Sequence, residues 1–142
     1  ALKRAAGDDR RIVFTGYVFG KGYYELGSNA YIFVETSGVG GTHPALVEAM
    51  AFGNCVITHN TAENLETIGE AGFAYDGQAG AVDLERVLAR LLANPLLVDD
   101  YARRAKARAD LVYTWDSVTD AYERLFYVVR GEDPPARLTS IA

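Results

Sequence analysis

The residues best suited to chemistry lie in a glycine-rich loop from Ser37 to His43. The apolar run Ala30–Val34 before the loop predicts a buried strand, and Pro44 after it predicts a helix start, because Pro is favoured at the first helical position. A strand, a glycine-rich turn and a helix start form an anion site, since backbone N–H groups and the positive end of the helix dipole face the same space. Three glycines would let this backbone take positive φ and let a ligand come close. They are Gly38, Gly40 and Gly41.

Glu48 lies inside the helix that this loop opens. Its apolar neighbours Leu46, Ala49 and Met50 predict the face toward the core, and Glu48 falls on a flank beside that face. A carboxylate there can accept hydrogen bonds from two vicinal hydroxyls, which ribose offers. Phosphates over the loop and a sugar at Glu48 indicate a nucleotide across the carboxyl ends of the strands, where open α/β sheets bind ligands.

The run Gly-Gly-Thr-His-Pro-Ala-Leu-Val-Glu-Ala-Met-Ala-Phe-Gly-Asn-Cys-Val-Ile, residues 40–57, resembles the donor-site motif of retaining glycosyltransferases with the GT-B fold. That large family includes sucrose and glycogen synthases, and its motif carries two glutamates eight positions apart. The second matches Glu48, whereas Gly40 stands in place of the first. Val-Gly-Gly-Thr-x-Pro is similar to a bacterial rhamnosyltransferase-like subgroup that also lacks the first glutamate. The resemblance spans roughly residues 11–130.

This resemblance implies an α/β fold: a Rossmann-like parallel sheet with flanking helices, forming the C-terminal half of a GT-B glycosyltransferase. A partial nucleotide-sugar-binding domain would occupy residues 1–130, and 131–142 would be a C-terminal tail. The implied reaction moves a hexose or a deoxyhexose, rhamnose among them, from a nucleoside diphosphate sugar to an acceptor hydroxyl. The donor is then a substrate, and no cofactor or metal is expected.

The resemblance also implies a set of site residues. Gly16, Tyr17 and Val18 would border the base, Gly40, Gly41, Thr42 and His43 would face the diphosphate and sugar, and Glu48 would hold the ribose. His43 is the catalytic candidate, as a donor that stabilises charge on the leaving group; the alternative is a helix-boundary residue with a solvated ring. An ordinary loop with a half-buried Tyr17 is the alternative for 16–18. Glu66 would help to hold the donor-site loops, or would simply bond to nearby backbone N–H groups.

Periodicity and turn residues predict the elements that position this site. Strands are expected at 11–15, 31–34, 55–58 and 73–75. Residues 1–6 are expected to be the end of a helix, and further helices are expected at 21–27, 63–68, 80–93 and 95–110. One more helix should run from Pro44 to a glycine cap at Gly53, and the last should follow an N-cap at Thr114. From Gly131 the chain is expected to leave regular structure. Strands and helices that alternate in short steps predict a parallel sheet.

Composition narrows the classes of partner. The 142 residues suffice for one domain with a hydrophobic core, and the net charge of −5 argues against a nucleic-acid partner. The basic residues of 103–108 predict a solvated helix face, with a membrane-surface contact as the minor alternative. The single cysteine, Cys55, excludes an internal disulfide and is typical of a cytoplasmic protein. No apolar stretch approaches the roughly 20 residues of a membrane span, and no signal peptide is visible.

Other chemistries fit poorly. No Gly-Lys-Ser/Thr follows the glycines, so the loop is not a P-loop. His43, His59 and Cys55 do not form a convincing metal set. Ser37 and Thr42 have no evident histidine–carboxylate partners, which argues against a hydroxyl nucleophile.

The chain has no initiator Met and begins inside a predicted helix, so we expect a part of a longer enzyme that is inactive by itself. Its partners would be the nucleotide-sugar donor and an N-terminal acceptor domain; peripheral membrane association through the acceptor and the oligomeric state stay open. A second hypothesis is a non-catalytic flavodoxin-like binding or scaffold domain, favoured slightly by Gly40 and by the lack of the family's phosphate-binding Arg and Lys. A third is a sugar-nucleotide epimerase or phosphorylase half-domain.

Overall fold

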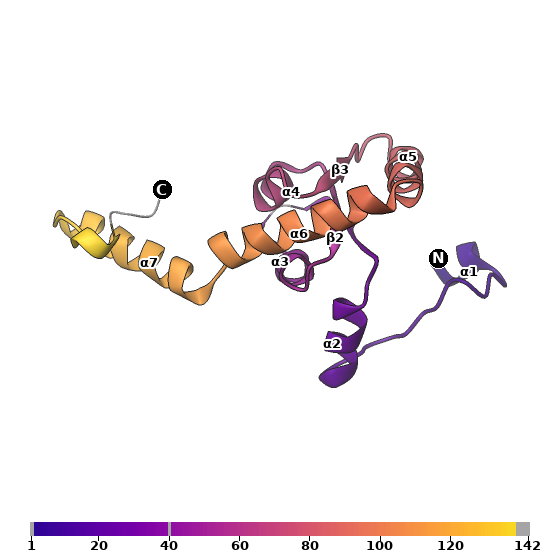
Figure 1. Cartoon of the computed structure of the whole chain (residues 1–142), viewed down its shortest axis with the longest axis horizontal. Coiled ribbons are helices and arrows are strands. Elements are labelled where there is room, and N and C mark those ends of the chain that lie inside the picture. The colour runs from indigo at the N-terminus through magenta and orange to yellow at the C-terminus, as the bar shows by residue number, and fades with distance from the viewer. Residues whose placement is uncertain (1, 40, 139–142) are drawn as a thin grey trace.

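A parallel three-stranded sheet forms the centre of the chain in the computed structural model, which describes residues 2–39 and 41–138 (Figure 1). The strands are β1 (Ile32–Glu35), β2 (Cys55–His59) and β3 (Phe73–Tyr75), in the order β1-β2-β3. The helices are α1 (Leu2–Ala6), α2 (Lys21–Ser28), α3 (Pro44–Ala51), α4 (Ala62–Ile68), α5 (Ala81–Leu92), α6 (Pro95–Val112) and α7 (Trp115–Arg130), followed by the 3-10 turn η1 (Ala136–Leu138). The α/β fold with a Rossmann-like parallel sheet, predicted from the sequence, is confirmed.

β2 is the central strand, and its residues 55–58 are fully buried. Strands that are buried on both faces consist of continuous apolar residues, and the apolar run 55–57 predicts this strand from the sequence. It pairs with β1 through Ile32 opposite Cys55 and with β3 through Ile57 opposite Phe73. Among the described strands, β1 has one neighbour and is only half-buried. It starts one residue later than predicted, since its pairing with β2 begins at Ile32.

Helices cover both faces of the sheet. Successive side chains of a strand point to opposite faces, so Val56 enters one core and Ile57 the other. On one face the core is formed by Leu46, Ala49, Met50, Val56, Ile68, Ala105 and Ala109, from α3, β2, α4 and α6. On the other it is formed by Cys55, Ile57, Tyr75, Val87, Leu91 and Val98, from β2, β3, α5 and α6. α6 contributes to both cores and so joins the two helix layers.

Local signals account for most helix boundaries. Pro44 opens α3, and Gly53 follows this helix with φ of 82°. Thr61 and Thr114 cap α4 and α7 as their side chains accept hydrogen bonds from the N–H groups of Asn64 and Ser117. The expected N-cap at Thr114 is therefore confirmed, as are the expected helices. Among the described residues, no helix combines the length and the apolarity needed to cross a bilayer.

The strand predicted at 11–15 is wrong. Ile12, Val13 and Phe14 are exposed and carry no strand pairing, and Figure 1 shows this segment running from α1 to α2 apart from the sheet. Its β-branched and aromatic residues favour extended backbone, but a strand also needs a neighbour to pair with. The expectation of irregular chain after Gly131 is wrong in part, because η1 forms and Leu138 is fully buried.

Neighbouring leucines at the end of α5 test this arrangement. Leu91 is fully buried, whereas Leu92 is 60% exposed. We expect Leu91→Ala to lower the free energy of unfolding by about 2–5 kcal/mol, because it removes core contacts and leaves a cavity. Leu92→Ala has the same effect on helix propensity, but it should change the free energy of unfolding by less than about 0.5 kcal/mol. Urea unfolding followed by circular dichroism measures both, and equal losses would contradict the assignment of this core.

Candidate functional site

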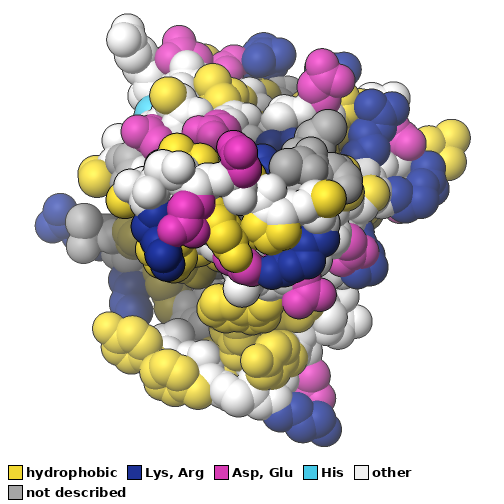
Figure 2. Space-filling model, turned by 90° about the vertical axis from the view of Figure 1, so that its left-hand side faces the viewer, with side chains coloured by type: hydrophobic (Ala, Val, Ile, Leu, Met, Phe, Trp, Pro, Cys, Tyr) yellow, Lys and Arg dark blue, Asp and Glu magenta, His cyan; other side chains and the backbone are white. Residues whose placement is uncertain are grey.

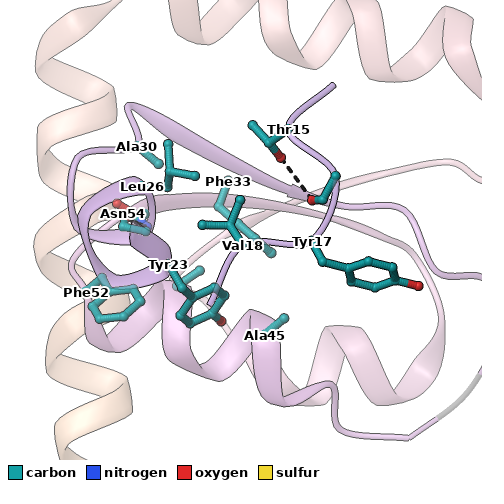
Figure 3. Close-up of a pocket in the computed structure, with 13 residues that line it drawn as sticks. Thr15, Tyr17, Val18, Tyr23, Leu26, Ala30, Phe33, Ala45, Phe52 and Asn54 are labelled. Atoms are coloured by element: carbon teal, nitrogen blue, oxygen red, sulfur yellow. Dashed lines mark hydrogen bonds between the residues drawn. The ribbon is translucent and has the colours of Figure 1, made fainter. Parts of the chain in front are cut away.

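A cavity of about 430 Å³ lies between the 15–18 segment, α2, β1 and α3 (Figure 3). This volume is typical of small-molecule sites. Gly16, Tyr17 and Val18, predicted to border a base, line one wall. The opposite walls are formed by Tyr23, Leu26 and Gly27 of α2, by Ala30 and Phe33, and by Ala45, Ala49 and Phe52 on the flank of α3. Among the residues that the structure describes, no charged side chain is part of this lining.

Close packing of α2 on α3 gives the cavity its shape. A Cβ on Gly27 would lie 2.6 Å from the Phe52 ring, so only glycine permits this approach. The buried Asn54, just before β2, donates from Nδ2 to the carbonyl of Gly27 over 2.9 Å. The Tyr24 ring meets the Phe52 ring edge-on at 6.0 Å. These contacts fix α2 beside the sheet, although α2 itself has no buried residue.

Aromatic side chains are exposed around the cavity. Tyr17 is 93% exposed and its ring stacks on that of Phe19, with centroids 6.1 Å apart and planes 7° apart. Tyr17 is therefore not half-buried, as the ordinary-loop alternative required. Figure 2 shows hydrophobic side chains gathered at the lower end of the molecule, the level at which Figure 1 places α2. Exposed hydrophobic residues of this part of the chain include Tyr17, Phe19, Tyr24 and Leu26.

Glu48 lies on the exposed side of α3, and its Oε2 accepts a hydrogen bond from the Tyr23 hydroxyl. Tyr23 in turn lines the cavity, so the carboxylate is joined to the cavity wall by one side chain. This hydrogen bond, with a smaller contribution from burial, raises the pKa of Tyr23. The sequence predicted only an apolar role for Tyr23, and no local pattern links residues that are 25 positions apart.

The glycine-rich loop lies at the start of α3, and its described residues do not line the cavity. Gly41 has φ of 114°, a conformation that favours glycine, whereas Gly38 does not have positive φ. Gly40 lies outside the described residues. Thr42 is exposed, and His43 occupies the N-cap position of α3 without a side-chain cap. The Nε2 of His43 lies 3.1 Å from the carbonyl oxygen of Val39, so this nitrogen donates to the loop itself.

A buried asparagine joins the loops that follow β1 and β2. Asn64 is fully buried, and its Nδ2 donates to the carbonyls of Ser37 (3.3 Å) and His59 (3.2 Å). Glu66, expected to hold these loops, is exposed instead, and its carbonyl accepts a hydrogen bond from Arg108. The Asn-x-Glu pattern is visible in the sequence, but only the two hydrogen bonds of the Asn64 side chain show that this residue makes the link.

His59 fills the space between two loops. Its ring meets Tyr75 edge-on at 5.5 Å, and a Cβ on Gly77 would lie 1.8 Å from its Nε2. A Cβ on Gly38 would lie 3.4 Å from the same atom. His59 is thus a packing residue under the glycine-rich loop. In the part of the chain that the structure describes, no three His, Cys, Asp or Glu side chains are placed to hold a metal ion.

Residues 1–94 match the family described as "Glycosyl transferases group 1". The match covers 94 of the 142 residues and includes the cavity, the glycine-rich loop and Glu48. The chain belongs to this family.

Membership of this family supports a function in glycosyl transfer, a reaction that needs a nucleotide-sugar donor and an acceptor. The predicted resemblance is confirmed at this level, while the retaining mechanism and the rhamnosyltransferase-like character stay predictions. No curated protein matches the chain. The matched residues end after α5, so α6 and α7 lie outside the match.

Removal of the Asn64 side-chain amide should destabilise the edge of the sheet that carries the glycine-rich loop. Asn64→Ala leaves two carbonyls without their donor, so we expect the free energy of unfolding to fall by about 1–3 kcal/mol. Asn94→Ala is the matched control, because Asn94 is exposed and, within the described chain, its side chain hydrogen-bonds only the carbonyl of Arg90. Urea unfolding compares them, and equal small losses would show that the Asn64 link does not matter for stability.

Cys55 should be inert in the folded protein. Its thiol is fully buried, and burial raises its pKa to about 11 because the charged thiolate is disfavoured there. At pH 8 the thiol is therefore protonated and inaccessible, and only the rare unfolded chains should react with a disulfide reagent such as DTNB. We expect the reaction rate to rise in parallel with urea unfolding; fast labelling of the native protein would contradict this burial.

Proposed function

We propose that this site binds the nucleoside diphosphate part of a sugar donor, and that the chain forms the donor-binding part of an enzyme. The reaction would move a hexose or a deoxyhexose, rhamnose among them, to an acceptor hydroxyl. The observation that carries the proposal is the position of Glu48: an exposed carboxylate that is hydrogen-bonded to a wall of an apolar cavity, on the helix that the glycine-rich loop opens.

The cavity is suited to the base. Its walls are apolar, while the backbone of Gly16, Tyr17 and Val18 offers donors and acceptors for the base edge. An exposed aromatic ring such as Tyr17 provides a face on which a base can stack. An anion would find no positively charged side chain in the described lining, and burying an unpaired charge is costly. The phosphates would therefore lie outside it.

Glu48 would accept hydrogen bonds from the ribose. It is four residues after Pro44, and an α-helix rises 1.5 Å per residue, so the ribose site lies about 6 Å from the start of α3. This is close to the reach from a ribose to its diphosphate. The phosphates would face Gly40, Gly41 and Thr42 at the positive end of the α3 dipole.

His43 would stabilise charge on the departing diphosphate. Its Nε2 now donates to the carbonyl of Val39, within the same loop. To stabilise the developing negative charge, this N–H would have to leave the Val39 carbonyl and turn toward the diphosphate. The role of His43 thus depends on a small movement of the loop when the donor binds.

Calorimetric titration with UDP, dTDP and GDP tests the proposal. We expect Glu48→Ala to weaken the binding of the preferred nucleotide by about 1.5–3 kcal/mol, which is roughly ten- to a hundredfold. Glu85→Ala, which removes an exposed carboxylate on α5, should leave binding unchanged. Equal affinities for both variants would contradict the assignment of Glu48. Absence of binding to all three nucleotides would favour the scaffold hypothesis.

A further inference from the structure

We propose that Tyr23 is a positioning residue of the donor site, which holds the Glu48 carboxylate in the orientation that receives the ribose. The proposal rests on the proposed function, since it concerns the same site. It adds a residue of α2 to a site that the sequence placed on the 16–18 segment, the glycine-rich loop and α3.

The contact itself is the first argument. The Tyr23 hydroxyl donates to Oε2 of Glu48, and within the described chain Tyr23 is the one side chain that hydrogen-bonds Glu48. The other carboxylate oxygen, Oε1, remains available to accept from a sugar hydroxyl. A tyrosine phenol is protonated in the neutral range, and the bond to Glu48 raises the pKa of Tyr23 further, so the hydroxyl acts as a donor there.

Preorganisation is the second argument. Glu48 is an exposed glutamate on a helix surface, and such a side chain samples several rotamers when it is free. Fixing it only when the ligand binds would cost conformational entropy, which weakens binding. The Tyr23 hydroxyl fixes it beforehand, so less entropy is lost on binding.

The third argument is that Tyr23 is itself held. Its ring meets the Tyr24 ring edge-on at 5.8 Å, and Tyr24 meets Phe52 of the α3 end in the same way. The bond from Asn54 to the Gly27 carbonyl anchors the other end of α2. Tyr23 also lines the cavity, so the side chain that orients Glu48 is in contact with the space proposed for the base. Occupation of the cavity and orientation of Glu48 are thereby coupled.

Tyr23→Phe and its neighbour Tyr24→Phe form a matched pair. Each change removes one hydroxyl and keeps the ring, but only Tyr23 donates to Glu48. Affinities are measured by calorimetry on the whole chain with UDP and GDP, each beside its 2′,3′-dideoxy form, and with dTDP, whose deoxyribose offers only the 3′-hydroxyl, beside the dideoxy form that lacks it. We expect Tyr23→Phe to weaken the binding of the preferred nucleotide about two- to tenfold, and Tyr24→Phe to leave it unchanged.

Two further results are expected. The dideoxy form of the preferred nucleotide has no ribose hydroxyl for Glu48, so Tyr23→Phe should not weaken its binding. In the double variant with Glu48→Ala, the loss should be no larger than in Glu48→Ala alone, because the two residues act as one unit. A hydroxyl that merely stabilises α2 would, when removed, weaken the binding of both nucleotide forms equally.

The results that would contradict the positioning role of Tyr23 differ from those that would contradict the proposed donor site. If Glu48→Ala weakens binding but Tyr23→Phe behaves like Tyr24→Phe, the positioning role is wrong and the proposed donor site stands. An equal loss for the ribose and dideoxy forms, or additive losses in the double variant, also overturns the positioning role. If no nucleotide binds, or if Glu48→Ala has no effect, the proposed function fails and this inference fails with it.

Discussion

Burial of four of the five residues of β2 is the constraint on which the rest of the fold depends. Residues 55–58 are fully buried, so both faces of the sheet need a helix layer. α3 and α4 supply one layer, α5 supplies the other, and α6 packs into both cores. Parallel pairing then brings the carboxyl ends of β1 and β2 to the same edge. The glycine-rich loop and the Asn64 link lie there as a consequence of this pairing.

Sequence patterns predicted the elements whose signals are local. Pro44, Gly53 and Thr114 mark helix ends through interactions within a few residues, and the structure has all three as expected. The 11–15 segment shows where such reasoning stops. Its composition is that of a strand, but pairing is a property of two segments, and none of the described strands pairs with it.

The candidate site shows the same limit. Glu48 and the 16–18 segment were predicted from the motif and from family resemblance. The structure places 16–18 in one wall of a cavity, and Glu48 is hydrogen-bonded to Tyr23 of another wall. The contacts that join the parts were not predictable. Tyr23 to Glu48 and Asn64 to Ser37 each span more than twenty residues, and no spacing rule covers such distances. Gly27 looked like a helix end, whereas its role is to admit the Phe52 ring.

The glycines of α2 have a consequence for its dynamics. The helix has eight residues, of which Gly22 and Gly27 are two, and interior glycine costs roughly 0.5–1 kcal/mol relative to alanine. A helix this short is marginal when isolated, so its order comes from Asn54, Phe52 and Glu48 on neighbouring elements. The amides of α2 should therefore exchange with deuterium much faster than those of β2. A ligand in the adjacent cavity would slow that exchange, so the exchange rate of the α2 amides would show whether the cavity is occupied.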